Sequence, residues 1–131
     1  MKLATTFKSL DIPIEKKDFI KQYLLLWKGY LNLTDSEITI LNELLYMYFD
    51  LYKKNSNKDL SFIEVFNSEN RKFISDKLEL SIHSFNNTFM RLKNKGIIVK
   101  TKYGYEVNSR LLPVKSITFN FNIKDDVTSI T

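Results

Sequence analysis

The strongest structural signals in this 131-residue chain lie in residues 75–107, SDKLELSIHSFNNTFMRLKNKGIIVKTKYGYEV. Apolar side chains recur there at spacings of three, four and three, the period of one face of an α-helix, at Ile82, Phe85, Phe89 and Leu92. Ser81 suits the N-cap, because its side-chain oxygen can accept a hydrogen bond from an otherwise unpaired backbone N–H. Gly96 suits the C-terminal end, where a left-handed backbone is common. We therefore predict a helix between Ser81 and Gly96 with this apolar stripe buried.

The other side of this helix carries hydrogen-bonding side chains. They are Ser84, Asn87, Thr88 and Arg91. An ordinary solvated face is a mixture of Glu and Lys, whereas short amides, hydroxyls and a forked guanidinium are groups that contact base edges in DNA.

Composition excludes several classes of site. The chain has no cysteine, which removes disulfides, thiolate metal sites and thiol catalysis. No run approaches the length of about 18 apolar residues that a membrane span needs, and residues 1–10 lack a signal-peptide pattern. We expect a single domain. We expect it in the cytoplasm without membrane contact, or, if the protein is phage-encoded, in the host cytoplasm or in a virion.

The net charge of +5 is unevenly distributed. Residues 81–112 contain six basic side chains and one acidic one, whereas residues 34–80 contain six basic and nine acidic ones. Basic groups clustered on one element are typical of phosphate binding, because each contact releases condensed counterions. A solvated basic face is the alternative.

The N-terminal third predicts an arm and one broad amphipathic helix. Residues 1–10 show no period, and a helix entered near Pro13 carries a wide aromatic stripe through about residue 30. This stripe packs on the chain's own core or contacts another subunit, for which Tyr23 and Trp27 are the candidates.

Three further helices are expected before residue 81. A capping box at Thr34 and Glu37 opens a central core helix that runs to about residue 53. Residues 60–66 favour a short helix. Asn67 or Ser68 can cap the next one. Its inward-facing residues are predicted to be Phe73, Ile74, Lys77 and Leu78. The join at residues 78–81 is too short for antiparallel packing and suits a steep helix crossing.

RKFISDKLELSIHSFNNTFMRLKNKGIIVK, residues 71–100, resembles the core of winged helix-turn-helix proteins. The resemblance covers roughly residues 34–108, and LKNKGII at residues 92–98 is its most specific part. Glu79 stands where many members have glycine, and Asn86-Asn87 replaces a more usual Ser/Thr-Val pair. The layout is similar to that of dimeric MarR-type regulators and of small phage or plasmid winged-helix proteins. It implies non-catalytic binding of double-stranded DNA by a transcriptional regulator or a replication initiator.

Carried onto this chain, the resemblance implies major-groove contacts from the helix after the turn. Asn87 can make a bidentate contact to adenine, and Arg91 a bidentate contact to guanine or a phosphate contact. Plain exposure of Asn87 and a surface ion pair of Arg91 are the alternatives. The full set of expected DNA-binding residues is Ser81, His83, Ser84, Asn87, Thr88, Arg91, Lys93, Lys95, Lys100, Lys102 and Tyr103.

Two β-prone runs follow Gly96, joined by Lys102, Tyr103 and Gly104. They predict a hairpin whose basic tip contacts phosphates or the minor groove, or else an ordinary hairpin with basic ends. Residues 116–123 then alternate strictly between polar and apolar, which predicts a strand. Its apolar face, Ile117, Phe119, Phe121 and Ile123, extends the sheet or pairs with another chain.

No enzyme signature is present. The chain has one histidine, His83, which we expect on a helix surface, and no Gly-rich phosphate loop, HExxH or paired-carboxylate pattern. We therefore expect no catalysis, cofactor, metal or small-molecule substrate.

The sequence thus predicts a mainly helical α+β fold, a winged helix-turn-helix (34–112) with an extra N-terminal helix (1–33) and an extra C-terminal strand (113–131). The expected partners are double-stranded DNA and a homo-oligomer or larger assembly. The alternative from another class is a virion or assembly protein that uses the same fold and its terminal segments for protein contacts.

Overall fold

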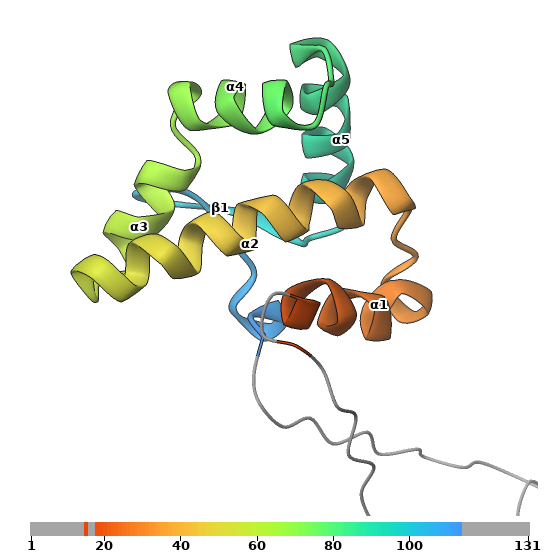
Figure 1. The fold of residues 1–131 in the computed structure, drawn as a ribbon, viewed down its shortest axis with the longest axis horizontal. Helices are drawn as coiled ribbons and strands as arrows, with labels where there is room; N and C mark the ends of the chain where they lie inside the picture. Colours follow the sequence, from red (N-terminus) through yellow and green to blue (C-terminus); the bar gives the residue numbers. More distant parts are fainter. Residues whose placement is uncertain (1–14, 16–17, 114–131) are drawn as a thin grey trace, which may run out of the picture.

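The computed structural model describes residue 15 and residues 18–113. In this part of the chain, five helices precede a two-stranded antiparallel sheet (Figure 1). The elements are α1 (Phe19–Leu31), α2 (Asp35–Asn55), α3 (Lys58–Val65), α4 (Ser68–Lys77), α5 (Ile82–Asn94), β1 (Ile98–Thr101), β2 (Gly104–Val107) and the 3₁₀ turn η2 (Ser109–Leu111). The mainly helical α+β class predicted from the sequence is confirmed.

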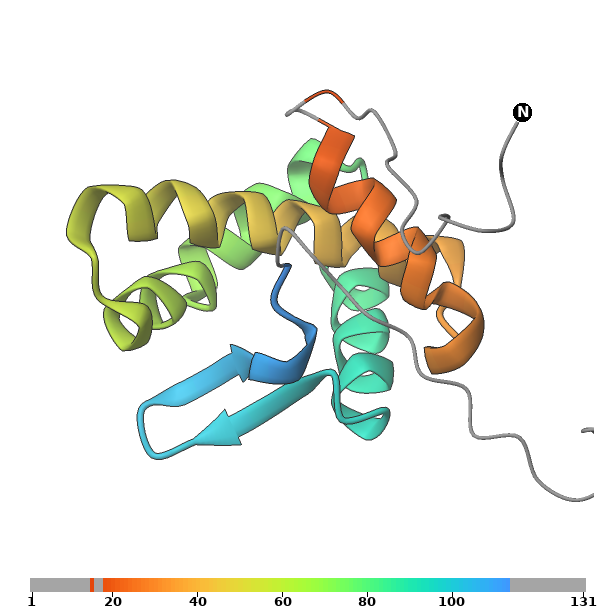
Figure 2. The same ribbon diagram turned by 90° about the horizontal axis from the view of Figure 1, so that it is seen from below.

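α2 lies at the centre of the fold and contacts the other four helices (Figures 1 and 2). The predicted capping box starts it: the Glu37 N–H donates to Thr34 Oγ1 at 3.2 Å, and the Thr34 N–H donates to Glu37 Oε1 at 2.7 Å. Both bonds satisfy backbone N–H groups at the start of α2 that have no acceptor within the helix.

The core forms where α1, α3, α5 and the base of the hairpin meet α2. The Phe62 ring of α3 stacks on Tyr48 of α2 with centroids 4.0 Å apart. Ile97, Ile98 and Val107 bring the start of the hairpin into the same cluster. Each such buried apolar side chain stabilises the fold by about 1.5–3 kcal/mol.

A short turn joins α4 to α5, and the two helices cross steeply (Figure 1). The Leu80 N–H donates to the Ser75 carbonyl at 2.8 Å, and the Glu79 N–H donates to the Asp76 carbonyl at 3.0 Å. These bonds require a left-handed residue at the turn, and Glu79 has a φ of +56°. A side chain at this φ is strained, so the chain keeps the turn geometry at a cost that glycine would avoid.

The end of α5 also requires a residue with a left-handed backbone, and there the residue is a glycine. Gly96 has a φ of +74°, and the Ile97 N–H donates to the Leu92 carbonyl at 3.0 Å. The chain then enters β1, which pairs with β2 in the antiparallel register from Ile98↔Val107 to Thr101↔Gly104. Figure 2 shows the hairpin projecting beside α5.

Three residues predicted to face the core, Phe73, Lys77 and Ile82, are exposed, which corrects the sequence interpretation. Phe73 is 58% exposed because it precedes the buried Ile74, and one residue rotates a side chain by about 100° around a helix. Ile82, 51% exposed, lies in the first turn of α5 beside an open groove. Tyr30, at the end of the aromatic stripe of α1, is 84% exposed and meets the Trp27 ring edge-on. The short helix favoured for residues 60–66 is confirmed as α3.

Candidate nucleic-acid interface

α5 presents an exposed face without an acidic side chain. Its buried side is formed by Phe85, Thr88, Phe89 and Leu92. The residues exposed on the opposite side include His83, Asn86, Asn87, Met90 and Asn94. Amide and imidazole groups both donate and accept hydrogen bonds, and none of these residues repels a phosphate. This face therefore has the chemistry to contact base edges.

Two of the predicted contacts on this face are paired. Asn87 Nδ2 lies 3.3 Å from His83 Nε2, one helical turn away. With the amide nitrogen as donor, the imidazole Nε2 is the acceptor. The pairing limits rotation of both side chains, while the amide keeps its second N–H and its carbonyl oxygen for a ligand.

Thr88 corrects the predicted exposed set. It is only 4% exposed, and its hydroxyl donates to the Ser84 carbonyl at 3.1 Å and accepts from Arg91 Nη2 at 3.0 Å. Position 88 lies three residues after Phe85 and four before Leu92, so it belongs to the buried stripe, and a threonine can face the core once its hydroxyl is bonded to the helix backbone. Ser81 and Ser84 are exposed, and the Ser84 N–H donates to Ser81 Oγ at 3.0 Å, which confirms the predicted N-cap.

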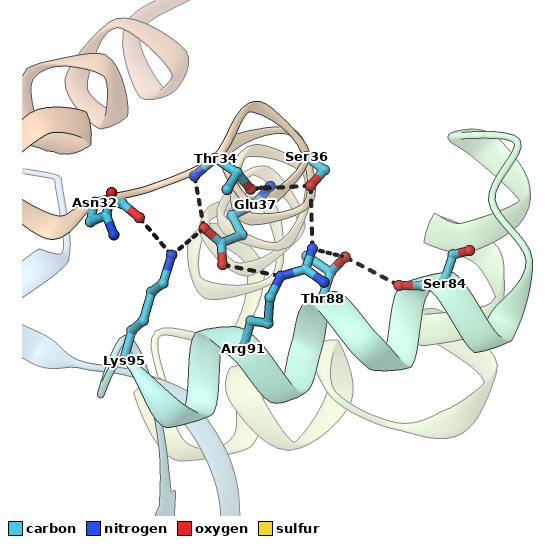
Figure 3. Close-up of polar contacts among 8 residues, drawn as sticks. All are labelled: Asn32, Thr34, Ser36, Glu37, Ser84, Thr88, Arg91 and Lys95. Atoms are coloured by element: carbon cyan, nitrogen blue, oxygen red, sulfur yellow. Dashed lines mark hydrogen bonds and ion pairs between the residues drawn. The ribbon is translucent and has the colours of Figure 1, made fainter.

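Arg91 and Lys95 hold the start of α2 through a buried glutamate (Figure 3). Glu37 is fully buried, and its Oε1 accepts from Lys95 Nζ at 2.6 Å. Arg91 Nε lies 3.6 Å from Oε2 of the same carboxylate. Lys95 also donates to the Asn32 carbonyl at 2.6 Å. Figure 3 shows one side of α5 facing the N-terminus of α2 across this network.

Two cations, Arg91 and Lys95, share the single carboxylate of Glu37 in this network. Burial raises the pKa of Glu37, but the hydrogen bonds from Lys95 and from the Thr34 N–H outweigh burial and hold the pKa below its ordinary value. The carboxylate is therefore ionised at neutral pH. The ion pair weighed as an alternative role for Arg91 is present, although the Arg91 side chain remains 47% exposed.

A second group of cations surrounds Tyr105 of β2. Lys93 Nζ lies 3.3 Å from the Tyr105 hydroxyl and 4.9 Å from the centroid of its ring. The hydrogen bond from Lys93 and the Lys93 charge, with smaller contributions from Lys100 and Arg71, lower the pKa of Tyr105. Arg71 of α4 lies over the Phe89 ring at 5.8 Å, and that ring meets Tyr105 edge-on.

The hairpin tip keeps its basic residues in solvent. Lys100 and Lys102 are exposed, Tyr103 is 53% exposed, and Lys102 Nζ lies 5.0 Å from the centroid of the Tyr103 ring. Thr101 Oγ1 closes the turn by accepting from the Tyr103 N–H and donating to the Gly104 carbonyl, both at 3.2 Å. Gly104 has a φ of +130°, as the predicted turn requires.

An open groove of about 510 Å³ separates α4 from α5. Arg71 and Lys72 line it from α4, and Ser81, Ile82 and Asn86 line it from α5. The sequence interpretation missed Arg71, Lys72, Asn86, Met90 and Asn94. The helical period alone places the last three opposite the buried stripe, whereas Arg71 and Lys72 join the interface only through the packing of α4 on α5.

The expected partner contacts are only partly described. Tyr23 is buried in the chain's own core, and its hydroxyl donates to the Leu112 carbonyl at 3.2 Å, so it offers no surface to another chain. This corrects its assignment as a partner contact, because the stripe of α1 faces α2. Trp27 is half-buried against the same core. Ile117, Phe119, Phe121 and Ile123 lie outside the described residues, as does the predicted arm.

Within residues 15 and 18–113, no group of three His, Cys, Asp or Glu side chains could hold a metal ion, and no helix is long and apolar enough to cross a membrane. No protein-family model, curated protein or solved structure matches this chain.

Proposed function

We propose that the chain is a winged helix-turn-helix protein that binds double-stranded DNA without catalysis and acts as a transcriptional regulator. In this proposal α4, the Glu79 turn and α5 form the helix-turn-helix, with α5 in the major groove. The β1–β2 hairpin is the wing that contacts the backbone or the minor groove.

The observation that carries the proposal is the exposed face of α5. A solvated helix normally mixes Glu with Lys, and α2, α3 and α4 all carry acidic groups in their first turns. α5 carries none, and its exposed side chains include three amides, Asn86, Asn87 and Asn94. α1 also lacks acidic side chains, but it exposes the large apolar side chains of Leu25, Leu26 and Tyr30, whereas most of the exposed side chains of α5 can form hydrogen bonds. Because acidic groups are unfavourable beside phosphates, this combination in α5 fits a DNA-facing role.

The surroundings of this face support the same role. On one side there are three lysines: Lys93 on α5 itself, Lys100 on β1 and Lys102 at the hairpin tip. On the other side, Arg71 and Lys72 of α4 line the groove. The acidic residue of the hairpin, Glu106, lies 3.9 Å from Lys58. The surroundings of α5 are thus positive on two sides, as phosphate contacts flanking a read-out helix require.

Each side chain has a defined task in this account. Asn87, braced by His83, makes the bidentate contact to adenine, and Asn86 and Lys93 contact the neighbouring bases or phosphates. Arg91 reaches a guanine or a phosphate by leaving Glu37. Lys95, at 2.6 Å from Glu37, keeps the carboxylate compensated when Arg91 moves.

The test is binding of the purified chain to duplex DNA of random sequence at about 50 and about 200 mM salt. The proposal expects binding that weakens steeply with salt. Asn87→Asp, which places a carboxylate on the read-out face, should abolish it, while Asn55→Asp at the far end of α2 should have no such effect. Binding that is absent, or equally strong for Asn87→Asp, would reject the proposal. A replication initiator would use the same interface and would differ by selecting sites at an origin.

A second candidate function is a structural or assembly protein, and one observation favours it. The side of α1 that faces away from α2 exposes Leu25, Leu26 and Tyr30, with Leu26 52% exposed. Exposed large apolar side chains on one helix are typical of protein-protein contacts. Oligomer mass measured by light scattering for the wild type and for Leu26→Lys/Tyr30→Lys tests this function separately from DNA binding.

A further inference from the structure

Three cations from three different elements meet at Tyr105. Lys93 of α5 donates to its hydroxyl at 3.3 Å, and Lys100 of β1 is its register partner across the hairpin. Arg71 of α4 lies over the Phe89 ring, which meets the Tyr105 ring edge-on. These side chains come from positions 71, 93 and 100 and converge only in the folded chain. We call Arg71, Lys93, Lys100 and Tyr105 the Tyr105 cluster.

The cluster has no internal counter-charge. Within the described part of the chain, none of its three cations forms an ion pair with a carboxylate, whereas six of the eleven other Lys and Arg side chains there do: Lys28, Lys54, Lys58, Lys77, Arg91 and Lys95. Asp76 lines the same groove as Arg71, and the two form no ion pair. Like charges gathered without an acid cost free energy, and an anionic ligand would offset that cost.

Arg71 is held in place but keeps unused donors. Its guanidinium lies 5.8 Å from the centroid of the Phe89 ring, a position that restricts its rotamers, and its Nε is buried without a hydrogen-bond partner. A buried donor without an acceptor is costly and is uncommon in native structures unless a ligand or water satisfies it. Because the side chain also lines the open groove, a ligand can reach it from solvent.

The electrostatics at the hydroxyl point the same way. Lys93, by its hydrogen bond and charge, and then Lys100 and Arg71 lower the pKa of Tyr105, which means that they stabilise negative charge at this oxygen. The same field favours an oxyanion next to the hydroxyl. Forked guanidinium and ammonium donors together are the usual partners of phosphate.

We propose that the Tyr105 cluster is a binding site for a phosphate group, with Arg71 and Lys93 as its principal donors. This inference rests on the proposed function, and the ligand is then a backbone phosphodiester of the DNA whose bases face α5. The site anchors the strand at the junction of α4, α5 and the hairpin, and it contributes affinity without sequence preference.

The experiment measures the dissociation constant of a random-sequence duplex by fluorescence anisotropy at several salt concentrations. Arg71→Gln and Lys93→Gln should each lower the slope of log Kd against log salt by about 0.9, so that the rise in Kd between about 50 and about 200 mM salt becomes about 3.5-fold smaller. Arg71→Lys keeps the charge and should keep most of the slope, which separates the charge from the stacking on Phe89. Arg110→Gln also removes one positive charge, but from η2, outside the Tyr105 cluster, and should leave the slope unchanged.

A second arm separates this site from the proposed function. Inorganic pyrophosphate is titrated into the wild-type chain, and the backbone amide resonances of Lys93 and Tyr105 are followed. Duplex binding with unchanged slopes in Arg71→Gln and Lys93→Gln overturns the site and leaves the proposed function standing. If pyrophosphate shifts these resonances but no duplex binds, the site stands as one for a free phosphate compound, and DNA is rejected as the ligand. The absence of both overturns both.

Discussion

Replacing Glu37 with glutamine should lower the free energy of unfolding by about 2 kcal/mol. Glutamine can still accept from the Thr34 N–H, so the capping box survives and only the charge is lost. The hydrogen bond from Lys95 at 2.6 Å is charge-assisted, a class of bond worth about 1.5–3 kcal/mol. Loss of one partner of a fully buried pair costs more, about 3–5 kcal/mol, but the Lys95 side chain is 26% exposed and keeps the Asn32 carbonyl, which favours the lower value.

The free energy of unfolding is measured by chemical denaturation followed by circular dichroism. In a separate heating curve, Glu37→Gln should lower the thermal midpoint by about 10 °C. Lys95→Gln should cost a similar amount, and the double variant should cost about 1 kcal/mol less than the sum of the two single changes. Glu43→Gln is the matched control: its Lys77 partner is 55% exposed, so its loss should cost less than about 1 kcal/mol. A change below about 0.5 kcal/mol for Glu37→Gln, or strict additivity in the cycle, would refute the assignment of this network as the link between α5 and α2.

Three further outcomes are expected. The folded-state pKa of Glu37 lies below its ordinary value of 4.5, so between these two values the unfolded chain binds more protons than the folded chain. The free energy of unfolding of the wild type should therefore fall as the pH drops through this range. In denaturation experiments at a series of pH values, Glu37→Gln should show a smaller fall. Glu79→Gly should raise the free energy of unfolding by about 0.5–1 kcal/mol because it relieves a φ of +56°, whereas Gly96→Ala, at a φ of +74°, should lower it by about 1 kcal/mol; equal signs for the two changes would contradict the turn geometry. Asn87→Ala should weaken binding to a selected duplex by about 1–3 kcal/mol and leave random duplex almost unchanged, whereas Lys102→Ala should weaken both alike in the same anisotropy assay.

The sequence predicted the parts of the fold that depend on local chemistry. Ser81 and Gly96 marked the two ends of α5, and Thr34 with Glu37 marked the start of α2, because caps and left-handed turns are determined by a few adjacent residues. The position of the turn after α4 was also predicted, but its length does not by itself decide the crossing, because only three residues reverse the chain between α1 and α2 (Figure 1).

The interactions between elements could not be predicted in this way. Glu37 was recognised as a cap, but nothing local indicates that its carboxylate also binds Lys95, 58 positions away. Thr88 was placed on the exposed face because threonine is polar, although its hydroxyl is satisfied by the helix itself. Arg71 was not considered, since its position over the Phe89 ring depends on how α4 packs against α5.

The central claim is that α5 reads DNA sequence, and its most direct test is selection from a randomised duplex pool by the wild type and Asn87→Ala in parallel, with sequencing of the retained molecules. The wild type should retain a defined motif, and the variant should lose its preference at a single adenine of that motif. If the wild type retains no motif, or if Asn87→Ala retains the same motif at full strength, α5 does not read DNA sequence in this way.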